Sequence, residues 1–514
     1  MDVFRKIGIG IVLIIPAFVG AGVVWDISHN WGAVFVWVVI IAGVYGAITK
    51  PWEDIPLPPI RKNQKILAMV RQYPGNVLEE LEGSPGLWVW VSFLVALLFL
   101  GGYALLMSLV HSMEVLEFYT NIPWALMVSN YVFLVGSSVG LCMVSSLGYV
   151  FGLRRYETIA KRGLFLALIT IVLGLSSIGL HLGHPERSAV YNALTPNIRS
   201  AMWWMGVIYP LYIVFAALWY WLLARTELIG TAAGSEGLKA RAYRLMALEG
   251  LRPFLCRRIP LERMEAKIYQ WLPLEKMGLS LDSDGVELRW ARIIGPLAFI
   301  FALLAYTVEG SLFAHVEARP LWYGALFPID FFLGASFCGF AWLLAAGIVS
   351  YRVRGEEIPA KLRDLIYEMA QILAVLLSIG LLFTAYKMGH GLFEPAKGKI
   401  IMLYLNGPFS TAFWVFEITI GMVLPIIMLL YAAWKRKTSV ALVASIMVLV
   451  GYFVKRYNFV VVSQVYPLIK RQNPLSSYFP TFMEVLLITG MIGALLLAYT
   501  LGVKFLPLKG ERSS

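Results

Sequence analysis

Charged residues are scarce in this sequence. They make up 14% of its 514 residues, while 59% are hydrophobic; an ordinary soluble domain has about 25% charged residues. A soluble protein of this size needs a more polar surface, and disordered chains, coiled coils and collagen-like chains differ in composition. The apolar runs are about 18–27 residues long with polar loops between them, so the sequence predicts membrane-spanning helices and not barrel strands.

Cysteine is also nearly absent. Cys142, Cys256 and Cys338 lie far apart, and the sequence contains no CxxC pair. It therefore has no iron–sulfur or zinc motif, and without CxxCH it has no site for c-type haem attachment. A b-type haem needs histidines deep within spans, whereas all six histidines here fall at span ends or in loops. We expect no metal, no haem and no disulfide framework in this chain.

Twelve apolar segments predict an all-α polytopic membrane protein in the bilayer. With the N-terminus in the cytoplasm, 33 of the 43 Lys and Arg residues fall in cytoplasmic segments. This asymmetry predicts cytoplasmic N- and C-termini and location in a prokaryotic cytoplasmic membrane. The net charge of +12 then reflects basic loops, and we expect no nucleic-acid partner. The predicted spans are about 7–24, 32–49, 87–110, 124–151, 163–182, 201–224, 291–314, 324–351, 363–388, 409–434, 439–454 and 482–503.

An internal repeat divides the spans. Pro123 begins one copy and Pro328 the other, and Gly183-His184 of the first copy matches Gly389-His390 of the second. Both copies start with the same orientation and contain four spans, which predicts two tandem four-helix bundles with flanking helices. The expected divisions are a hairpin with a cytoplasmic loop (1–86), a flanking helix (87–123), the first bundle (124–314), the second bundle (324–457) and a C-terminal flanking helix (458–514).

The long cytoplasmic loop at 225–290 leaves two interpretations open. Its segment 239–270 mixes basic with apolar residues. This pattern fits an amphipathic helix on the anionic inner leaflet, and it equally fits a solvated basic loop.

Titratable residues gather at the outer ends of the predicted spans. His181 and His184 end a span in His-Leu-Gly-His-Pro-Glu-Arg, and histidine can both donate to a quinone carbonyl and exchange its protons near neutral pH. The alternative is an interfacial histidine pair bonded to loop carbonyls. Glu309, Glu417 and Glu484 lie within apolar spans, where a carboxyl serves either a proton relay or an interhelical hydrogen bond.

Four motifs carry a resemblance to a known family. They are Pro123-Trp124 leading into 130–136, His181-Leu182-Gly183-His184-Pro185-Glu186-Arg187, the segment 456–464 (RYNFVVVSQ) and Pro480-Thr481-Phe482-Met483-Glu484. Together they resemble the NrfD/PsrC-type (polysulfide reductase membrane-subunit) family over roughly residues 87–503. The last two motifs are similar to its ten-span branch, in which the P subunit of the sulfite-reduction-associated Dsr complex and its archaeal Hme relative are the members we expect to be most similar.

The resemblance implies a quinone-reactive subunit that acts in catalysis only within its complex. Menaquinone or another quinone would be bound as substrate, and electrons would pass to or from an extracytoplasmic ferredoxin-like iron–sulfur subunit, with further membrane or cytochrome subunits as partners. The quinone site would include His181, His184, Asn130 and Trp204. His181 stands where many relatives carry Asp, and His184 where many carry Arg, which changes the expected hydrogen bonds. The predicted proton path comprises Glu309, Glu417, Asp330, His390 and Glu484.

Two rival functions remain at this point. A secondary transporter of twelve spans would relate spans one to six to spans seven to twelve, whereas the repeat found here has a register of four spans. A purely structural anchor for a redox partner would tolerate replacement of His181. The direction of electron flow and the terminal substrate are not encoded in these residues.

Overall fold

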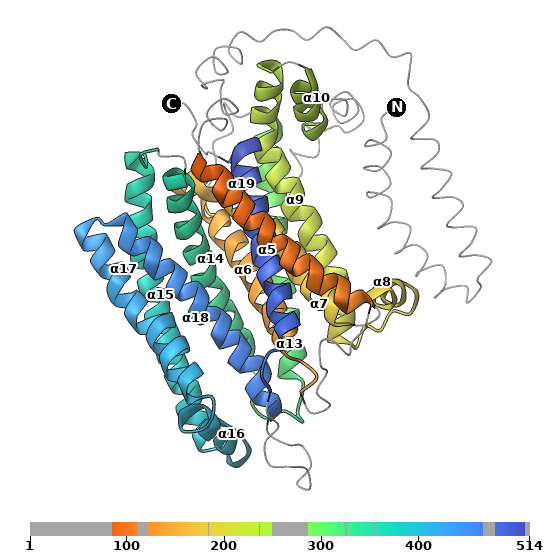
Figure 1. The fold of residues 1–514 in the computed structure, drawn as a ribbon, viewed down its shortest axis with the longest axis vertical. Coiled ribbons are helices and arrows are strands. Elements are labelled where there is room, and N and C mark those ends of the chain that lie inside the picture. Colours follow the sequence, from red (N-terminus) through yellow and green to blue (C-terminus); the bar gives the residue numbers. More distant parts are fainter. Residues whose placement is uncertain are drawn as a thin grey trace, which may run out of the picture.

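The protein is built from long helices that run back and forth in alternating directions (Figure 1). The computed structural model describes residues 85–110, 122–182, 185–235, 237–248, 286–323, 326–353, 356–465 and 478–508. Within these ranges ten helical segments are long and apolar enough to cross a membrane. They correspond to the last ten predicted spans, while the segments 7–24 and 32–49 lie outside the described residues.

The first part of the described chain contains a flanking helix and the predicted first bundle. Helix α6 packs against α7, α13 and α14, and α9 packs against α7 and α13. The bounds in this part are α5 Pro85–Val110, α6 Leu126–Tyr149, η2 Arg154–Tyr156, α7 Glu157–His181, α8 Pro185–Leu194, α9 Ala201–Ala233, α10 Gly237–Met246 and α13 Val286–Ala314.

The second part contains the predicted second bundle and the C-terminal helix. Helix α18 packs against α14, η5 and α17, and α15 packs against α14 and α17. The division of the chain into two four-helix domains stays a prediction. The bounds in this part are α14 Leu326–Val353, α15 Ala360–Leu392, α16 Pro395–Leu405, η5 Ala412–Val423 (a π-helical stretch), α17 Leu424–Lys435, α18 Thr438–Val465 and α19 Phe482–Phe505.

Helix α5 crosses α19 on the outside of the molecule (Figure 1). The crossing point is a pair of glycines, Gly101 and Gly490, whose backbones approach too closely for a side chain. Large apolar side chains of α5, including Trp88, Phe93 and Phe99, are exposed. An apolar exposed face on a spanning helix is what contact with lipid or with another membrane helix requires.

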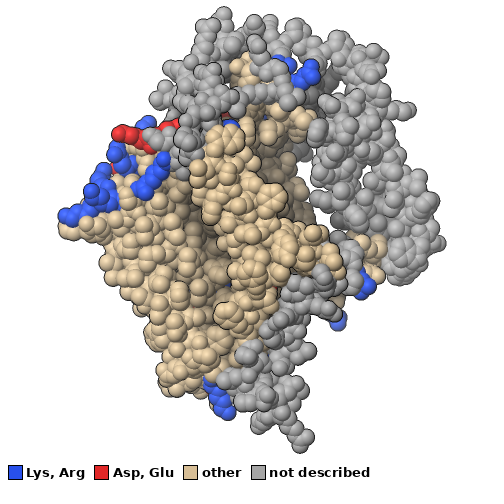
Figure 2. All heavy atoms as spheres, in the orientation of Figure 1, with Lys and Arg blue, Asp and Glu red and all other residues tan. Residues whose placement is uncertain are grey.

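The two ends of the helices differ in charge. We call the end with Arg155 and Lys435 the basic end, and the end with His181, His315 and His390 the histidine end. Figure 2 shows Lys and Arg gathered mainly over the upper part of the visible face, with smaller groups lower down. The histidine end also carries the short helices α8 and α16 (Figure 1).

Helix α18 is longer than its sequence suggests. The apolar run stops at residue 454, and the expected domain boundary follows at 457, but the helix continues to Val465. It continues because Lys455 and Arg456 are buried against other helices and do not reach an aqueous interface, being only 4% and 0% exposed. The predicted boundary therefore lies inside a single helix.

Candidate functional site

Asp330 is the centre of a buried ion cluster in the second part of the chain. Its Oδ1 lies 2.8 Å from Nζ of Lys455, and its Oδ2 lies 3.5 Å from Nζ of Lys387 and 3.5 Å from Nη1 of Arg456. The carboxyl comes from α14, and the three cations come from α15 and α18. A single carboxyl thus serves three cations, which holds three helices together at a depth where an unpaired charge is costly.

Polar groups on neighbouring helices complete the cluster. Lys455 Nζ donates to Thr384 Oγ1 at 3.3 Å. Arg456 Nη2 donates to the Tyr452 hydroxyl at 2.9 Å, and that hydroxyl lies 2.7 Å from the Tyr306 hydroxyl of α13. The guanidinium also lies over the ring of Phe331, 4.1 Å from its centroid. Arg456 therefore connects the ion cluster to the first group of helices.

Glu417 lies on the other side of the cluster, on the π-helical stretch η5. Its Oε2 accepts a hydrogen bond of 2.9 Å from Asn458 Nδ2, and the Asn458 carbonyl accepts one of 2.7 Å from the Tyr404 hydroxyl. Burial, reinforced by the nearby Glu417, raises the pKa of Tyr404 on α16 well above its usual range, so this phenol stays a neutral donor. Wide π-helical turns in otherwise α-helical segments are frequent at functional sites.

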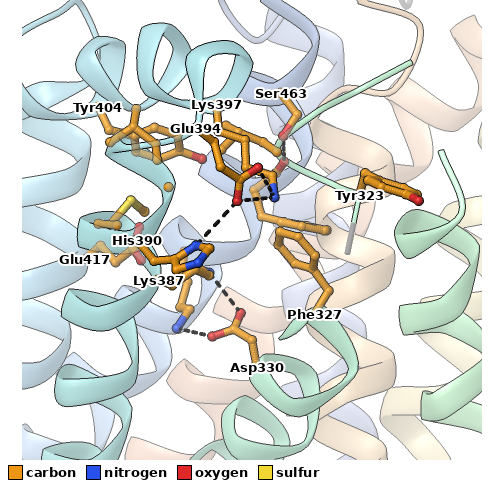
Figure 3. A pocket seen from close by; sticks show the side chains of 16 residues that line it. Tyr323, Phe327, Asp330, Lys387, His390, Glu394, Lys397, Tyr404, Glu417 and Ser463 are labelled. Carbon is orange, nitrogen blue, oxygen red and sulfur yellow. Dashed lines mark hydrogen bonds and ion pairs between the residues drawn. The ribbon is translucent and has the colours of Figure 1, made fainter. Parts of the chain in front are cut away.

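A cavity of about 240 Å³ opens beside these groups (Figure 3). Asp330, Lys387, Glu417 and Lys455 line its inner part, and the sticks in Figure 3 converge on it from several helices. Apolar and aromatic side chains form the rest of the wall: Leu321, Tyr323, Phe327, Met388, Ile401 and Phe459. The volume is enough for several water molecules, so the cavity can bring water to the charged groups.

A smaller ion group lies at the histidine end of this cavity. Glu394 pairs with Lys397 at 2.8 Å and with His390 Nδ1 at 3.4 Å (Figure 3). The His390 side chain is 55% exposed, so this group faces the aqueous side while Asp330 does not. Three of the residues predicted for the proton path, Asp330, Glu417 and His390, therefore line one cavity.

Glu309 is the fourth predicted path residue, and it lies in the first group of helices. It is fully buried on α13. Neither of its carboxyl oxygens has a hydrogen-bond partner among the described residues. Arg456 is in electrostatic range of this carboxyl, and the hydroxyls of Tyr131 and Tyr209 bond to each other nearby. Glu309 is thus connected to the ion cluster through Arg456.

The predicted quinone residues lie mostly at the histidine end of the first group. Asn130 is buried, and its Nδ2 donates to Ser177 Oγ at 3.2 Å. His181 follows Ser177 by one turn on the same face of α7, which brings it close to Asn130. Trp204, on the first turn of α9, is 41% exposed and donates from Nε1 to the Ile198 carbonyl at 2.9 Å. His184 lies outside the described residues.

Glu484, the fifth predicted path residue, has a different environment. It lies at the start of α19, where its carboxyl accepts from the Thr481 backbone amide at 3.0 Å and from the Tyr478 hydroxyl at 2.7 Å. The Thr481 side chain accepts in return from the Glu484 amide, which completes a capping box. Burial, with the nearby carboxyl of Glu484, raises the pKa of Tyr478 well above its usual range. These contacts account for a buried glutamate here, and its place in a proton path stays a prediction.

Removing the capping side chain tests this assignment. Thr481→Ala is expected to lower the free energy of unfolding by about 1 kcal/mol, because the first turn of α19 loses a hydrogen-bond acceptor. Thr489→Ala is the matched control, since Thr489 is exposed in mid-helix and bonds to the Val485 carbonyl four residues before it. Thermal unfolding of both variants in detergent gives the comparison. Equal effects of the two substitutions would contradict the capping role.

Sequence reasoning missed several residues of the site. Lys387 was not a candidate, although a lysine one to two turns from the end of an apolar span is itself a signal. Lys455 and Arg456 were expected either to pair with a span glutamate or to extend to the interface. The structure pairs both with Asp330. The connecting hydroxyls of Tyr306 and Tyr452 give no pattern in a sequence with 25 tyrosines.

Comparison with known proteins identifies the family. The family model "Polysulphide reductase, NrfD" matches residues 114–468, which is most of the chain. The chain belongs to the NrfD family. It is therefore a multi-pass integral membrane protein of a family of oxidoreductase membrane subunits, and the resemblance found from its motifs is confirmed.

Three curated relatives of this NrfD protein align over most of their length. A selenate reductase subunit of Mesobacillus selenatarsenatis is 25% identical over 75% of this chain and 85% of the relative. The "Hdr-like menaquinol oxidoreductase integral membrane subunit" of Archaeoglobus fulgidus is 23% identical over 82% and 94%. A dimethyl sulfoxide reductase membrane subunit of Halobacterium salinarum, named from its sequence, is 23% identical over 82% and 91%.

Proposed function

We propose that this NrfD protein is the quinone-reactive membrane subunit of a respiratory redox complex. It would exchange electrons between the menaquinone or other quinone pool and an extracytoplasmic ferredoxin-like iron–sulfur subunit. The observation that carries this proposal is the family match over residues 114–468 together with a menaquinol oxidoreductase membrane subunit that aligns over 94% of its length. Each relative is named as a subunit, which supports partner subunits here as well.

The quinone site is proposed at the histidine end of the first group of helices. Asn130, Ser177 and His181 supply amide, hydroxyl and imidazole groups within two turns of one another, which is the donor set that quinone carbonyls need. Trp204, and His184 on the same segment as His181, complete the proposed site. Oxidation of one quinol delivers two electrons to the partner subunit and two protons to nearby acceptors, and His181 is placed to take one of them.

The histidine end is proposed to face the extracytoplasmic side, with the basic end in the cytoplasm. The excess of Lys and Arg at the basic end supports this orientation. In it, the cavity of the second group opens towards the side of the iron–sulfur partner. Glu309, Asp330, Glu417 and His390 then form a proposed route for protons between the quinone site and that cavity.

The first test is to purify the complex in mild detergent, extract bound quinone and identify the co-purified subunits. Retained quinone with an iron–sulfur partner is the expected result. His181→Ala is expected to lower quinol oxidation and quinone retention at least tenfold, while His315→Ala at the same end should leave both unchanged, since His315 is exposed and contacts the Ser311 carbonyl within its own helix. Unchanged quinol oxidation in His181→Ala would remove His181 from the site and favour a structural anchor.

A secondary transporter is the second candidate, because a water-sized cavity lined by charged groups also suits an ion-binding transporter. The same purification separates the two functions. A chain that purifies alone, without quinone, and moves ions in liposomes without a redox partner would favour the transporter.

A further inference from the structure

Six buried ionisable side chains, which we call the charge network, extend across both groups of helices. The network is Glu309, Asp330, Lys387, Glu417, Lys455 and Arg456. It contains three carboxyls and three cations, so its total charge is zero when every group is ionised. Its members are joined by the ion pairs of Asp330 and by electrostatic contact of Glu417 with Lys455 and of Glu309 with Arg456.

The charge network is isolated from solvent except at one place. Five of its six members are at most 4% exposed. The exception is Lys387, whose side chain is 18% exposed and lines the cavity. In such an environment a net charge is costly, and a neutral total is strongly favoured. A change of ionisation at one member must therefore be offset at another.

Lys387 is the cation held by the weakest contacts. Its Nζ lies 3.5 Å from Asp330, whereas Lys455 lies 2.8 Å from the same carboxyl and also donates to Thr384. Arg456 stays protonated in proteins under all ordinary conditions. Lys387 alone combines weak pairing with direct access to the cavity, so its proton is the one that can be lost to water.

Glu309 is the carboxyl held by the weakest contacts. Its oxygens have no hydrogen-bond partner among the described residues, whereas Glu417 accepts from Asn458 and Asp330 has three ion pairs. The groups facing it are Tyr131 of α6, Tyr209 of α9, Tyr306 of α13 and Arg456 of α18.

We propose that the charge network keeps a constant total charge, so that uptake of a proton by Glu309 is matched by loss of a proton from Lys387 into the cavity. The proton added to Glu309 converts its carboxylate to the acid, and the ammonium of Lys387 becomes a neutral amine. The released proton passes to cavity water, beside His390 and Glu394. No electron moves in this exchange. Its use in quinol turnover rests on the proposed function, whereas the coupling is a property of the network itself.

The test is a pH titration of the purified complex followed by infrared difference spectroscopy. The carbonyl stretch of protonated Glu309 is assigned by its loss in Glu309→Gln. In Lys387→Met the titration midpoint of this band is expected to move up by about one pH unit, because the anionic form of Glu309 loses a compensating charge. In Glu417→Gln, which removes a negative charge, it should move down. The double variant restores neutrality and should return the midpoint to near the wild-type value.

Lys397→Met is the matched control. Lys397 lines the same cavity, but its partner is Glu394 and it does not belong to the charge network. This substitution should leave the Glu309 band where it is. A band that does not titrate in the wild type, an unchanged midpoint in Lys387→Met, or shifts of the same sign in Lys387→Met and Glu417→Gln would overturn the proposal.

A second measurement on the same samples separates this proposal from the proposed function. A short-chain menaquinol is added, and reduction of the iron–sulfur partner is followed by electron paramagnetic resonance. Opposite midpoint shifts without reduction of the partner would support the coupling and reject the quinone function. Normal reduction with a fixed midpoint would support the quinone function and reject the coupling.

Discussion

Alanine in place of Gly140 is expected to force α6 and α14 apart and to destabilise the whole protein. A Cβ atom at Gly140 would overlap the Ala335 carbonyl oxygen, and one at Gly339 would overlap the Gly140 carbonyl oxygen. These neighbours are backbone atoms that cannot rotate away. The loss should be about 3 kcal/mol, the upper part of the usual range for overpacking, and it should exceed the gain of about 1 kcal/mol in helix propensity.

Thermal unfolding of the purified complex in detergent measures this effect. Gly347→Ala is the matched control, because Gly347 lies on the same helix α14 and a Cβ there would meet nothing within 4 Å. The control should be neutral or slightly stabilising. If Gly140→Ala behaved like Gly347→Ala, the close contact of α6 with α14 would be wrong.

The second large effect is expected from Asp330→Leu. This substitution leaves Lys387, Lys455 and Arg456 buried without their shared carboxyl, and breaking a buried ion pair on one side costs about 3–5 kcal/mol. We expect the variant to accumulate poorly and to unfold at a much lower temperature. Adding Lys455→Leu removes one of the stranded charges and should recover part of the loss.

An exposed ion pair provides the control for Asp330. Asp364 pairs with Arg436 at 3.0 Å at the basic end, and both side chains are more than half exposed. Asp364→Leu should therefore change the free energy of unfolding by less than about 1 kcal/mol. A double variant at 330 and 455 that is less stable than Asp330→Leu alone would contradict the ion cluster as described.

The spans were predictable from sequence because their signal is local. About twenty consecutive apolar residues mark each of them, and ten are confirmed among the described residues. The gathering of Asp330, Glu417 and His390 at one end was also predictable, because span direction alone places them there. What the sequence could not show was which of them share a cavity, since that depends on how α14, α15, η5 and α18 face one another.

Lys455 and Arg456 illustrate why the rest required a structure. Read one residue at a time, two cations end an apolar run, and the predicted span stops at residue 454. Their burial is favourable only because a carboxyl from α14 reaches them, and no local pattern connects residue 330 with residue 455. Glu484 is the converse case: its sequence position within an apolar span suggests a relay, while its contacts are those of a helix cap.

The depths of Glu309 and Lys387 have a consequence for energy conservation. Glu309 lies five residues before the end of α13 at Ala314, and Lys387 lies five residues before the end of α15 at Leu392. At 1.5 Å per residue both are about 7–8 Å below the histidine end. Charge exchanged between them moves parallel to the membrane plane and crosses little of the transmembrane voltage, which acts only along the normal. The exchange is thus insulated from the membrane potential, and only protons that travel on to the basic end would work against it.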